Sequence, residues 1–280
     1  MESVDLDAFF IDGIAGRLFC LLHKPPVLVA TRGAIVYLHP FAEEMNKARR
    51  MAALQARAFA DAGWLVLQPD LFGCGDSAGE FADARWDIWI DDAARALAWL
   101  ANYSGRRPLT WGLRAGCLLA VAAAERSSTA SELLFWQPVL SGKQHLQQVL
   151  RMKIAGALLA EGRTAANGTR QLREQFEQGH GVEVAGYMLS PALALGLDAA
   201  TLKPPSAGGR LVWLELSGAN LPDLSPGSRQ ALAEWQSAGW RVEARALPGP
   251  PFWQTQEIEE VPSLIACTTT CVADLESCAM

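Results

Sequence analysis

A repeated alternation of short apolar runs with amphipathic helical segments is the feature that most constrains the fold. Residues 34–38 (AIVYL) form a continuous apolar run, as a strand buried on both faces of a sheet requires. The following segment, 46–62, carries apolar residues at helical spacing and ends at Gly63, a typical C-terminal helix signal. Such alternation predicts an α/β fold with a mainly parallel sheet covered by helices on both faces.

The same pattern predicts the other elements of the chain. Between about 141 and 205 the alternation gives way to mixed helical sequence, which we interpret as a cap or lid inserted between two parts of one core, 1–140 and 206–280. Strands are expected at 8–11, 16–23, 64–67, 109–112, 132–136, 182–187, 211–216 and 241–246, and helices at 86–102, 117–125, 226–238 and from 261 onward.

The net charge and the apolar runs indicate whether to expect a nucleic-acid partner or a membrane span. The 24 Lys and Arg against 30 Asp and Glu give a net charge of −6, so we expect no nucleic-acid partner. The first residues are acidic where a secretion signal would be basic and then apolar, which indicates a cytoplasmic protein. No apolar run approaches the roughly 20 residues of a membrane span, and the sequence leaves the oligomeric state open.

The cysteines do not form a metal-binding pattern. Six are scattered without a C-x-x-C pair, and a reducing cytoplasm disfavours disulfides. We expect Cys267, Cys271 and Cys278 to lie in a loosely ordered C-terminus. His39 and Glu43 could touch a metal, but two ligands fall short of a site. We therefore expect neither a metal nor a cofactor.

Ligands on such sheets bind outside the carboxyl ends of the strands, so the loops that follow the strands are informative. Residues 38–41 (LHPF) resemble the oxyanion loop of the α/β-hydrolase superfamily, with proline in place of its glycine. Residues 70–77 (DLFGCGDS) resemble the Asp-x-x-Gly-x-Gly-x-Ser loop of these enzymes. Residues 111–116 (WGLRAG) stand where the nucleophile elbow Gly-x-Ser-x-Gly belongs. The resemblance implies an α/β-hydrolase fold with a helical cap.

Longer motifs resemble one family within this superfamily. The runs PFAEEMNKARR (40–50), PDLFGCGDSAGEF (69–81), WGLRAG and PGPPFWQTQEIEEVPSLI (248–265) are together similar to the exosortase A system-associated hydrolase 2 family. That resemblance implies a bacterial hydrolase from loci that pair protein sorting with exopolysaccharide production. The resemblance also implies an ester, acyl or glycan-linked substrate.

The elbow departs from the hydrolase pattern because its tip is Arg114. A guanidinium stays protonated and only donates hydrogen bonds, so it cannot attack a carbonyl. One interpretation is an anion site, with Arg114 beside the amides of Phe41 and Ala115 at a helix start. The other is a salt bridge from Arg114 to Glu43, Glu44 or Asp70. Both give Arg114 an acidic partner.

A second match to Gly-x-Ser-x-Gly lies at 75–79, with Ser77 at its centre. No apolar strand runs directly into it and no apolar helix follows at once, so we interpret Ser77 as a turn or cap residue and only a weak nucleophile candidate. Cys117 is interpreted as a buried helix cysteine.

The histidines provide the second departure. In this fold the catalytic base follows the last strand, but residues 247–253 (LPGPPFW) contain no histidine and none follows them. His39 and Glu43 are weak alternatives for acid–base chemistry, with loop hydrogen bonding the main interpretation of His39. For the acid position, Asp223 and Glu215 are the candidates. His145 and His180 are expected to be exposed in the cap.

Two functions remain open at this point. The first is a hydrolase or acyltransferase with rearranged chemistry in the loops around His39, Glu43, Ser77 and Arg114. The second is a catalytically inactive hydrolase-fold protein whose Arg114, with Glu44 and Trp253 nearby, holds an anionic ligand or a partner segment. Five of the ten tryptophans are expected near strand ends or in the helix after the glycine-rich loop: Trp86, Trp89, Trp111, Trp136 and Trp253. They could form aromatic walls suited to a glycan or acyl ligand, although core packing explains most of them equally well.

Overall fold

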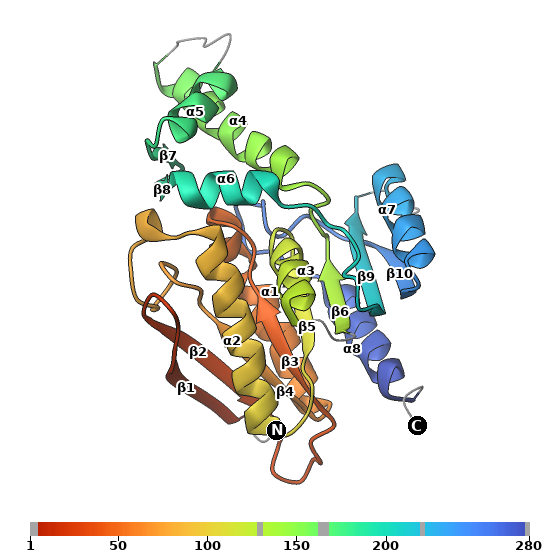
Figure 1. Cartoon of the computed structure of the whole chain (residues 1–280). Coiled ribbons are helices and arrows are strands. Elements are labelled where there is room, and N and C mark those ends of the chain that lie inside the picture. Colours follow the sequence, from red (N-terminus) through yellow and green to blue (C-terminus); the bar gives the residue numbers. More distant parts are fainter. Residues whose placement is uncertain (1–4, 128–130, 162–167, 219–221, 278–280) are drawn as a thin grey trace.

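A computed structural model describes residues 5–127, 131–161, 168–218 and 222–277, and its main feature is a mixed eight-stranded sheet (Figure 1). The sheet order is β1-β2-β4-β3-β5-β6-β9-β10. The first two strands pair antiparallel, β2 pairs antiparallel with β4, and the remaining six run parallel. The strands are β1 Asp5–Asp12, β2 Arg17–Lys24, β3 Gly33–Leu38, β4 Trp64–Pro69, β5 Leu109–Leu113, β6 Ser131–Trp136, β9 Gly209–Ser217 and β10 Arg241–Pro248.

Helices cover both faces of the sheet, as the alternation predicts. The helices α1 Glu43–Asp61 and α8 Pro262–Ser277 bury apolar side chains in one core, whose members include Phe59 and Val272. The helices α2 Trp86–Ser104, α3 Gly116–Ser127 and α7 Pro226–Ser237 contribute to the core on the other face. The predicted α/β fold class is therefore confirmed.

The segment between β6 and β9 contains helices and a small hairpin. Its elements are α4 Gly142–Glu161, α5 Gly168–Glu177, β7 Val182–Val184, β8 Tyr187–Leu189 and α6 Pro191–Ala199. They lie above the carboxyl ends of the parallel strands in Figure 1, and α6 packs against α2. One 3₁₀ turn, Phe81–Asp83, lies before α2 and contacts β8.

Three sequence predictions need correction. The strand expected at 182–187 is two short strands, because Ala185 and Gly186 both take positive φ and turn the chain between them. Cys267 and Cys271 are in helix α8, and Cys271 is fully buried rather than loosely ordered. Cys278 lies outside the described residues.

The third correction concerns His145. It was expected to be exposed, but it is 3% exposed because α4 turns this face toward the core. His180 is exposed, as expected.

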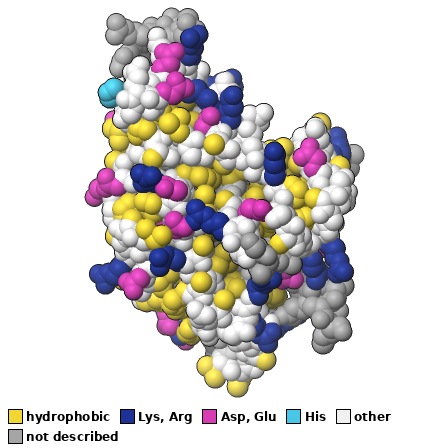
Figure 2. All heavy atoms as spheres, in the orientation of Figure 1, with side chains coloured by type: hydrophobic (Ala, Val, Ile, Leu, Met, Phe, Trp, Pro, Cys, Tyr) yellow, Lys and Arg dark blue, Asp and Glu magenta, His cyan; other side chains and the backbone are white. Residues whose placement is uncertain are grey.

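On the face shown in Figure 2, acidic and basic side chains are interspersed with apolar ones. Within the described residues, no helix has the length and apolar character needed to cross a membrane.

Candidate ligand-binding site at the strand ends

The turn between β5 and α3 has the geometry of a nucleophile elbow. Arg114 at its tip has φ 55°, and the helix begins two residues later at Gly116. A Cβ on Gly112 would lie 2.8 Å from the backbone of Cys117, and one on Gly116 would lie 2.2 Å from the Leu38 carbonyl oxygen. Only glycine fits at both positions, so the two small residues of the motif serve the sharp turn that an elbow requires.

Arg114 is held by groups from three parts of the chain. Its Nε lies 3.3 Å from Glu44 Oε1, and its Nη1 lies 3.4 Å from the Gln137 carbonyl oxygen. The guanidinium carbon lies 5.3 Å from the centre of the Trp253 ring, a cation–π distance. Of the three acids expected as partners, Glu44 is the one found, and Asp70 pairs with Arg49 instead.

A cavity of about 610 Å³ opens over Arg114. Its lining combines polar residues from the core and from α4 with apolar residues from α4 and from the β7–β8 hairpin. The described lining contains no serine, threonine or cysteine. Its residues are Phe41, Ala42, Glu43, Glu44, Arg114, Gln137, His145, Gln148, Val149, Met152, Val184, Ala185, Tyr187, Leu189, Trp253 and Gln254.

Backbone strain is concentrated around this cavity. Within the described residues, four non-glycine residues have positive φ: Ala42, Arg114, Gln137 and Ala185. All four line the cavity. Since positive φ is costly for residues with a Cβ, its concentration at one site is typical of a functional site.

Glu44 and His145 meet in the buried part of the cavity. His145 Nε2 lies 4.0 Å from Glu44 Oε2, too far for a hydrogen bond. Burial raises the pKa of Glu44, and the Arg114 charge opposes that shift. Burial, together with the same Arg114 charge, lowers the pKa of His145 to about 3. The imidazole is therefore neutral at physiological pH and can both donate and accept a hydrogen bond.

The loop after β10, where the base of a hydrolase would be, contributes Trp253 to the cavity. Its indole Nε1 is buried and has no hydrogen-bond partner among the described residues. The two acid candidates serve other roles: Glu215 accepts hydrogen bonds from Trp213 Nε1, Ser225 N and Ser228 Oγ. Asp223 is exposed and pairs with Arg229. Neither acid lines the cavity.

The weak catalytic candidates are divided between the cavity and the core. Glu43 lines the cavity. Ser77 does not, since its hydroxyl donates to the Asp70 carbonyl at 2.6 Å and accepts from Phe19 N at 2.8 Å. His39 accepts a hydrogen bond from Leu71 N at 3.4 Å and lines a separate cavity of about 210 Å³.

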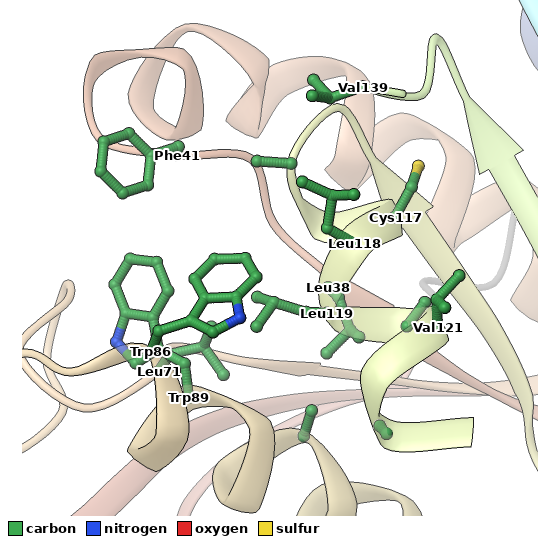
Figure 3. Close-up of a cluster of buried hydrophobic side chains, with 14 of the residues drawn as sticks. Leu38, Phe41, Leu71, Trp86, Trp89, Cys117, Leu118, Leu119, Val121 and Val139 are labelled. Carbon is green, nitrogen blue, oxygen red and sulfur yellow. The ribbon is translucent and has the colours of Figure 1, made fainter. Parts of the chain in front are cut away.

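Phe41 connects the cavity to the core beneath it. Figure 3 shows its ring above Trp86 and Trp89, which come from α2, with Leu118 of α3 nearby. The ring centres of Phe41 and Trp89 are 5.9 Å apart in an edge-to-face arrangement. Trp86, Trp89, Trp111 and Trp136 are buried core residues, so of the five tryptophans expected near the strand ends only Trp253 lines the cavity.

The two backbone amides expected to bind an anion belong to buried residues, and only Phe41 lines the cavity. Neither Phe41 N nor Ala115 N donates a hydrogen bond within the part of the chain that the structure describes. Ala115 itself is buried at the start of α3 and its side chain does not line the cavity.

The sequence prediction missed two polar groups of this site, His145 and the Gln137 carbonyl. A signal existed for His145, because it lies one helical turn before Val149, whose side chain is on the buried face of α4. Gln137 had no comparable signal, because its role depends on a positive φ at the end of β6.

Comparison with known proteins supports the fold. No family model and no curated protein matches the chain. Solved structures that resemble it include a thermostable carboxyl esterase from Bacillus coagulans in complex with glycerol, with a TM-score of 0.65 and 12% identity over 98% of each chain. An α/β serine hydrolase without a lid from Xanthomonas campestris has a TM-score of 0.57 and 15% identity over 98% of this chain and 97% of that one. Est1E from Butyrivibrio proteoclasticus, bound to ferulic acid, has a TM-score of 0.58 and 14% identity over 95% and 98%. The chain therefore has the α/β-hydrolase fold.

Proposed function

We propose that this chain is a hydrolase-fold binding protein that holds a small acyl, acid or glycan-linked ligand in the Arg114 cavity without covalent catalysis. The observation that carries the proposal is the elbow itself. Its strained tip presents a guanidinium paired with Glu44, and the loop of the missing base presents Trp253. A cation and an indole cannot perform nucleophilic attack and proton transfer, but both bind ligands.

The free donors favour a ligand with an acceptor oxygen. Arg114 has more N–H groups than its two recorded contacts use, and Trp253 Nε1 is unpartnered among the described residues. The amides of Phe41 and Ala115 add donors near the elbow. A carboxylate, an ester carbonyl or a glycan-linked acyl group would match these donors.

A second candidate is a hydrolase with rearranged chemistry. The space between Glu44 Oε2 and His145 Nε2 could hold a water molecule, with Glu44, whose pKa is raised by burial, as its base and the neutral imidazole of His145 positioning it. Such an enzyme would cleave an ester, acyl or glycan-linked substrate without a serine.

The sequence motifs, rather than the cavity, support a biological setting. The four runs shared with the exosortase A system-associated hydrolase 2 family support a bacterial role beside exopolysaccharide production, and the acidic first residues support a cytoplasmic location. That assignment is part of the proposal.

The two proposed functions differ in whether the protein hydrolyses its ligand. The test measures hydrolysis of nitrophenyl esters by the wild-type protein and by Arg114→Gln, Ser77→Ala and His145→Phe. In parallel, thermal shift measures stabilisation by a panel of carboxylic acids. We expect no ester hydrolysis, and a rise in Tm with at least one acid that Arg114→Gln does not show.

Wild-type turnover would overturn the binding proposal, and the variants would identify the chemistry. Loss of ester hydrolysis in His145→Phe alone would support the water-based hydrolase, whereas loss of ester hydrolysis in Ser77→Ala would support a serine enzyme. Arg170→Gln, on an exposed part of α5, is the matched control for removal of an arginine.

A further inference from the structure

Unpartnered buried polar atoms converge on the Arg114 cavity. Within the described residues, eight buried side-chain nitrogen and oxygen atoms lack a hydrogen-bond partner, and four of them belong to three residues of its lining. These atoms are Glu44 Oε2, Trp253 Nε1 and both ring nitrogens of His145. Because an unpartnered buried polar group is costly, such a set marks a place prepared for a polar ligand.

The distance between Glu44 Oε2 and His145 Nε2 indicates which ligand group fits between them. With 4.0 Å between Oε2 and Nε2, one oxygen atom can lie within about 2.8 Å of both. That oxygen must donate its hydrogen to the Glu44 carboxylate while it accepts a hydrogen bond from the imidazole N–H. A hydroxyl does both, whereas an ether or carbonyl oxygen has no hydrogen for Glu44.

Charge excludes the ionic alternatives for this position. Burial raises the pKa of Glu44, and a second carboxylate beside it would raise that pKa further and compete with Glu44 for the Arg114 charge. A ligand ammonium would lie beside the Arg114 guanidinium, whose positive charge adds to burial in lowering the pKa of His145. A neutral group with both a donor and an acceptor satisfies the position.

The neighbouring donors place an acyl or acid group next to that hydroxyl. Arg114 contacts Glu44 Oε1, so its remaining N–H groups lie beside the Glu44–His145 gap. Apolar side chains such as Val149 and Met152 then line the space left for the rest of the ligand.

We infer that the cavity selects a hydroxylated carboxylic acid or acyl compound. The hydroxyl lies between Glu44 and His145, and the carbonyl or carboxylate lies against Arg114 and Trp253. This inference rests on the proposed binding function and adds the class of ligand. In this account His145 determines ligand specificity.

Three matched aromatic acids test the hydroxyl position. Mandelate carries a hydroxyl beside its carboxylate, phenylacetate lacks it, and α-methoxyphenylacetate has the oxygen without a hydrogen to donate. Isothermal titration would measure the Kd of each for the wild-type protein and for His145→Phe and Glu44→Gln. His180→Phe, with an exposed histidine, and Glu174→Gln, with an exposed glutamate, are the matched controls.

We expect wild-type protein to bind mandelate roughly tenfold more tightly than either other acid, as one hydrogen bond to a charged group provides. The preference should disappear in His145→Phe, shrink in Glu44→Gln and persist in both controls. Retained phenylacetate binding shows that a variant is folded.

Equal affinity of wild-type protein for the three acids, or a preference unchanged in both variants, would overturn the inference and leave the binding function intact. Failure of all three acids to bind would also overturn it. Ester hydrolysis, measured separately, would overturn the binding function while the mandelate preference stayed interpretable.

Discussion

An arginine at the tip of the β5–α3 turn changes what the residues around it must do. Glu44 is 8% exposed and lies 3.3 Å from the Arg114 Nε, so each charge depends on the other for compensation. Removal of one partner from such a pair costs more than removal of both, because a buried charge is left without a partner.

A double-mutant cycle at Arg114 and Glu44 tests this dependence. We expect Arg114→Gln to lower the free energy of unfolding by about 3 kcal/mol, and Glu44→Gln in the same chain to restore part of it. Urea denaturation provides the four values. The exposed pair Arg170–Glu174 serves as a control and should show little coupling. Additive effects at Arg114 and Glu44 would contradict the account.

His145 makes stability depend on pH. Its pKa is lowered from 6.5 to about 3 by burial and by Arg114, so between these values the unfolded chain binds a proton that the folded chain does not. Stability from this residue is therefore present above pH 6.5 and is lost as the pH falls toward 3. Between pH 7 and pH 5 the loss should be roughly 2 kcal/mol.

Urea denaturation of wild type, His145→Gln and His180→Gln at pH 7 and pH 5 measures this loss. The pKa of Glu44 is raised, so Glu44 contributes with the opposite sign, and it is present in all three proteins. We expect His145→Gln to lose less stability than wild type between the two pH values. An identical loss in wild type and His145→Gln would show that His145 does not titrate as described.

At the scale of elements, the elbow works because β3, β5 and α3 approach closely. A Cβ on Gly116 would meet the Leu38 carbonyl at 2.2 Å, and backbone cannot move aside as a side chain can. We expect Gly116→Ala to destabilise the fold by about 3 kcal/mol, the upper end of overpacking costs. Thermal and urea denaturation measure it.

The control for that substitution is Gly218→Ala, where a Cβ would meet nothing within 4 Å. This variant should unfold close to the wild-type midpoint. If Gly116→Ala were equally mild, the close packing of strand and helix at the elbow would be wrong.

The sequence predicted the elements well where burial determines them locally. The strand predicted at 34–38 corresponds to β3, and the helix predicted at 46–62 corresponds to α1. A fully apolar run indicates a strand buried on both faces, and apolar residues at helical spacing indicate a helix with one buried face. The β7–β8 hairpin was not predicted, because its turn requires a positive φ at Ala185 and alanine is not a typical turn residue.

The candidate site was only partly predictable for a related reason. The elbow motif and the loop of the missing histidine indicated Arg114 and Trp253 as neighbours. The choice of Glu44 over Glu43 or Asp70, and the burial of His145, depend on how α1 and α4 lie over the strand ends. Such contacts are set by tertiary packing, which a local pattern does not contain.

For the whole molecule, an α/β-hydrolase fold surrounds a cavity at which the tip of the elbow is an arginine. The eight-stranded sheet and the helices around it resemble solved α/β-hydrolase structures over 98% of the chain. The described cavity lining has no serine, threonine or cysteine, and Ser77 is held by two backbone hydrogen bonds outside it. The central claim is that this cavity binds its ligand without forming a covalent bond to it.

Intact-mass spectrometry after incubation with a fluorophosphonate probe, with a known serine esterase as the reagent control, detects such a bond. We expect the wild-type protein to keep its unmodified mass while the esterase gains one probe. A single adduct on the wild-type protein, lost in Ser77→Ala, would contradict it.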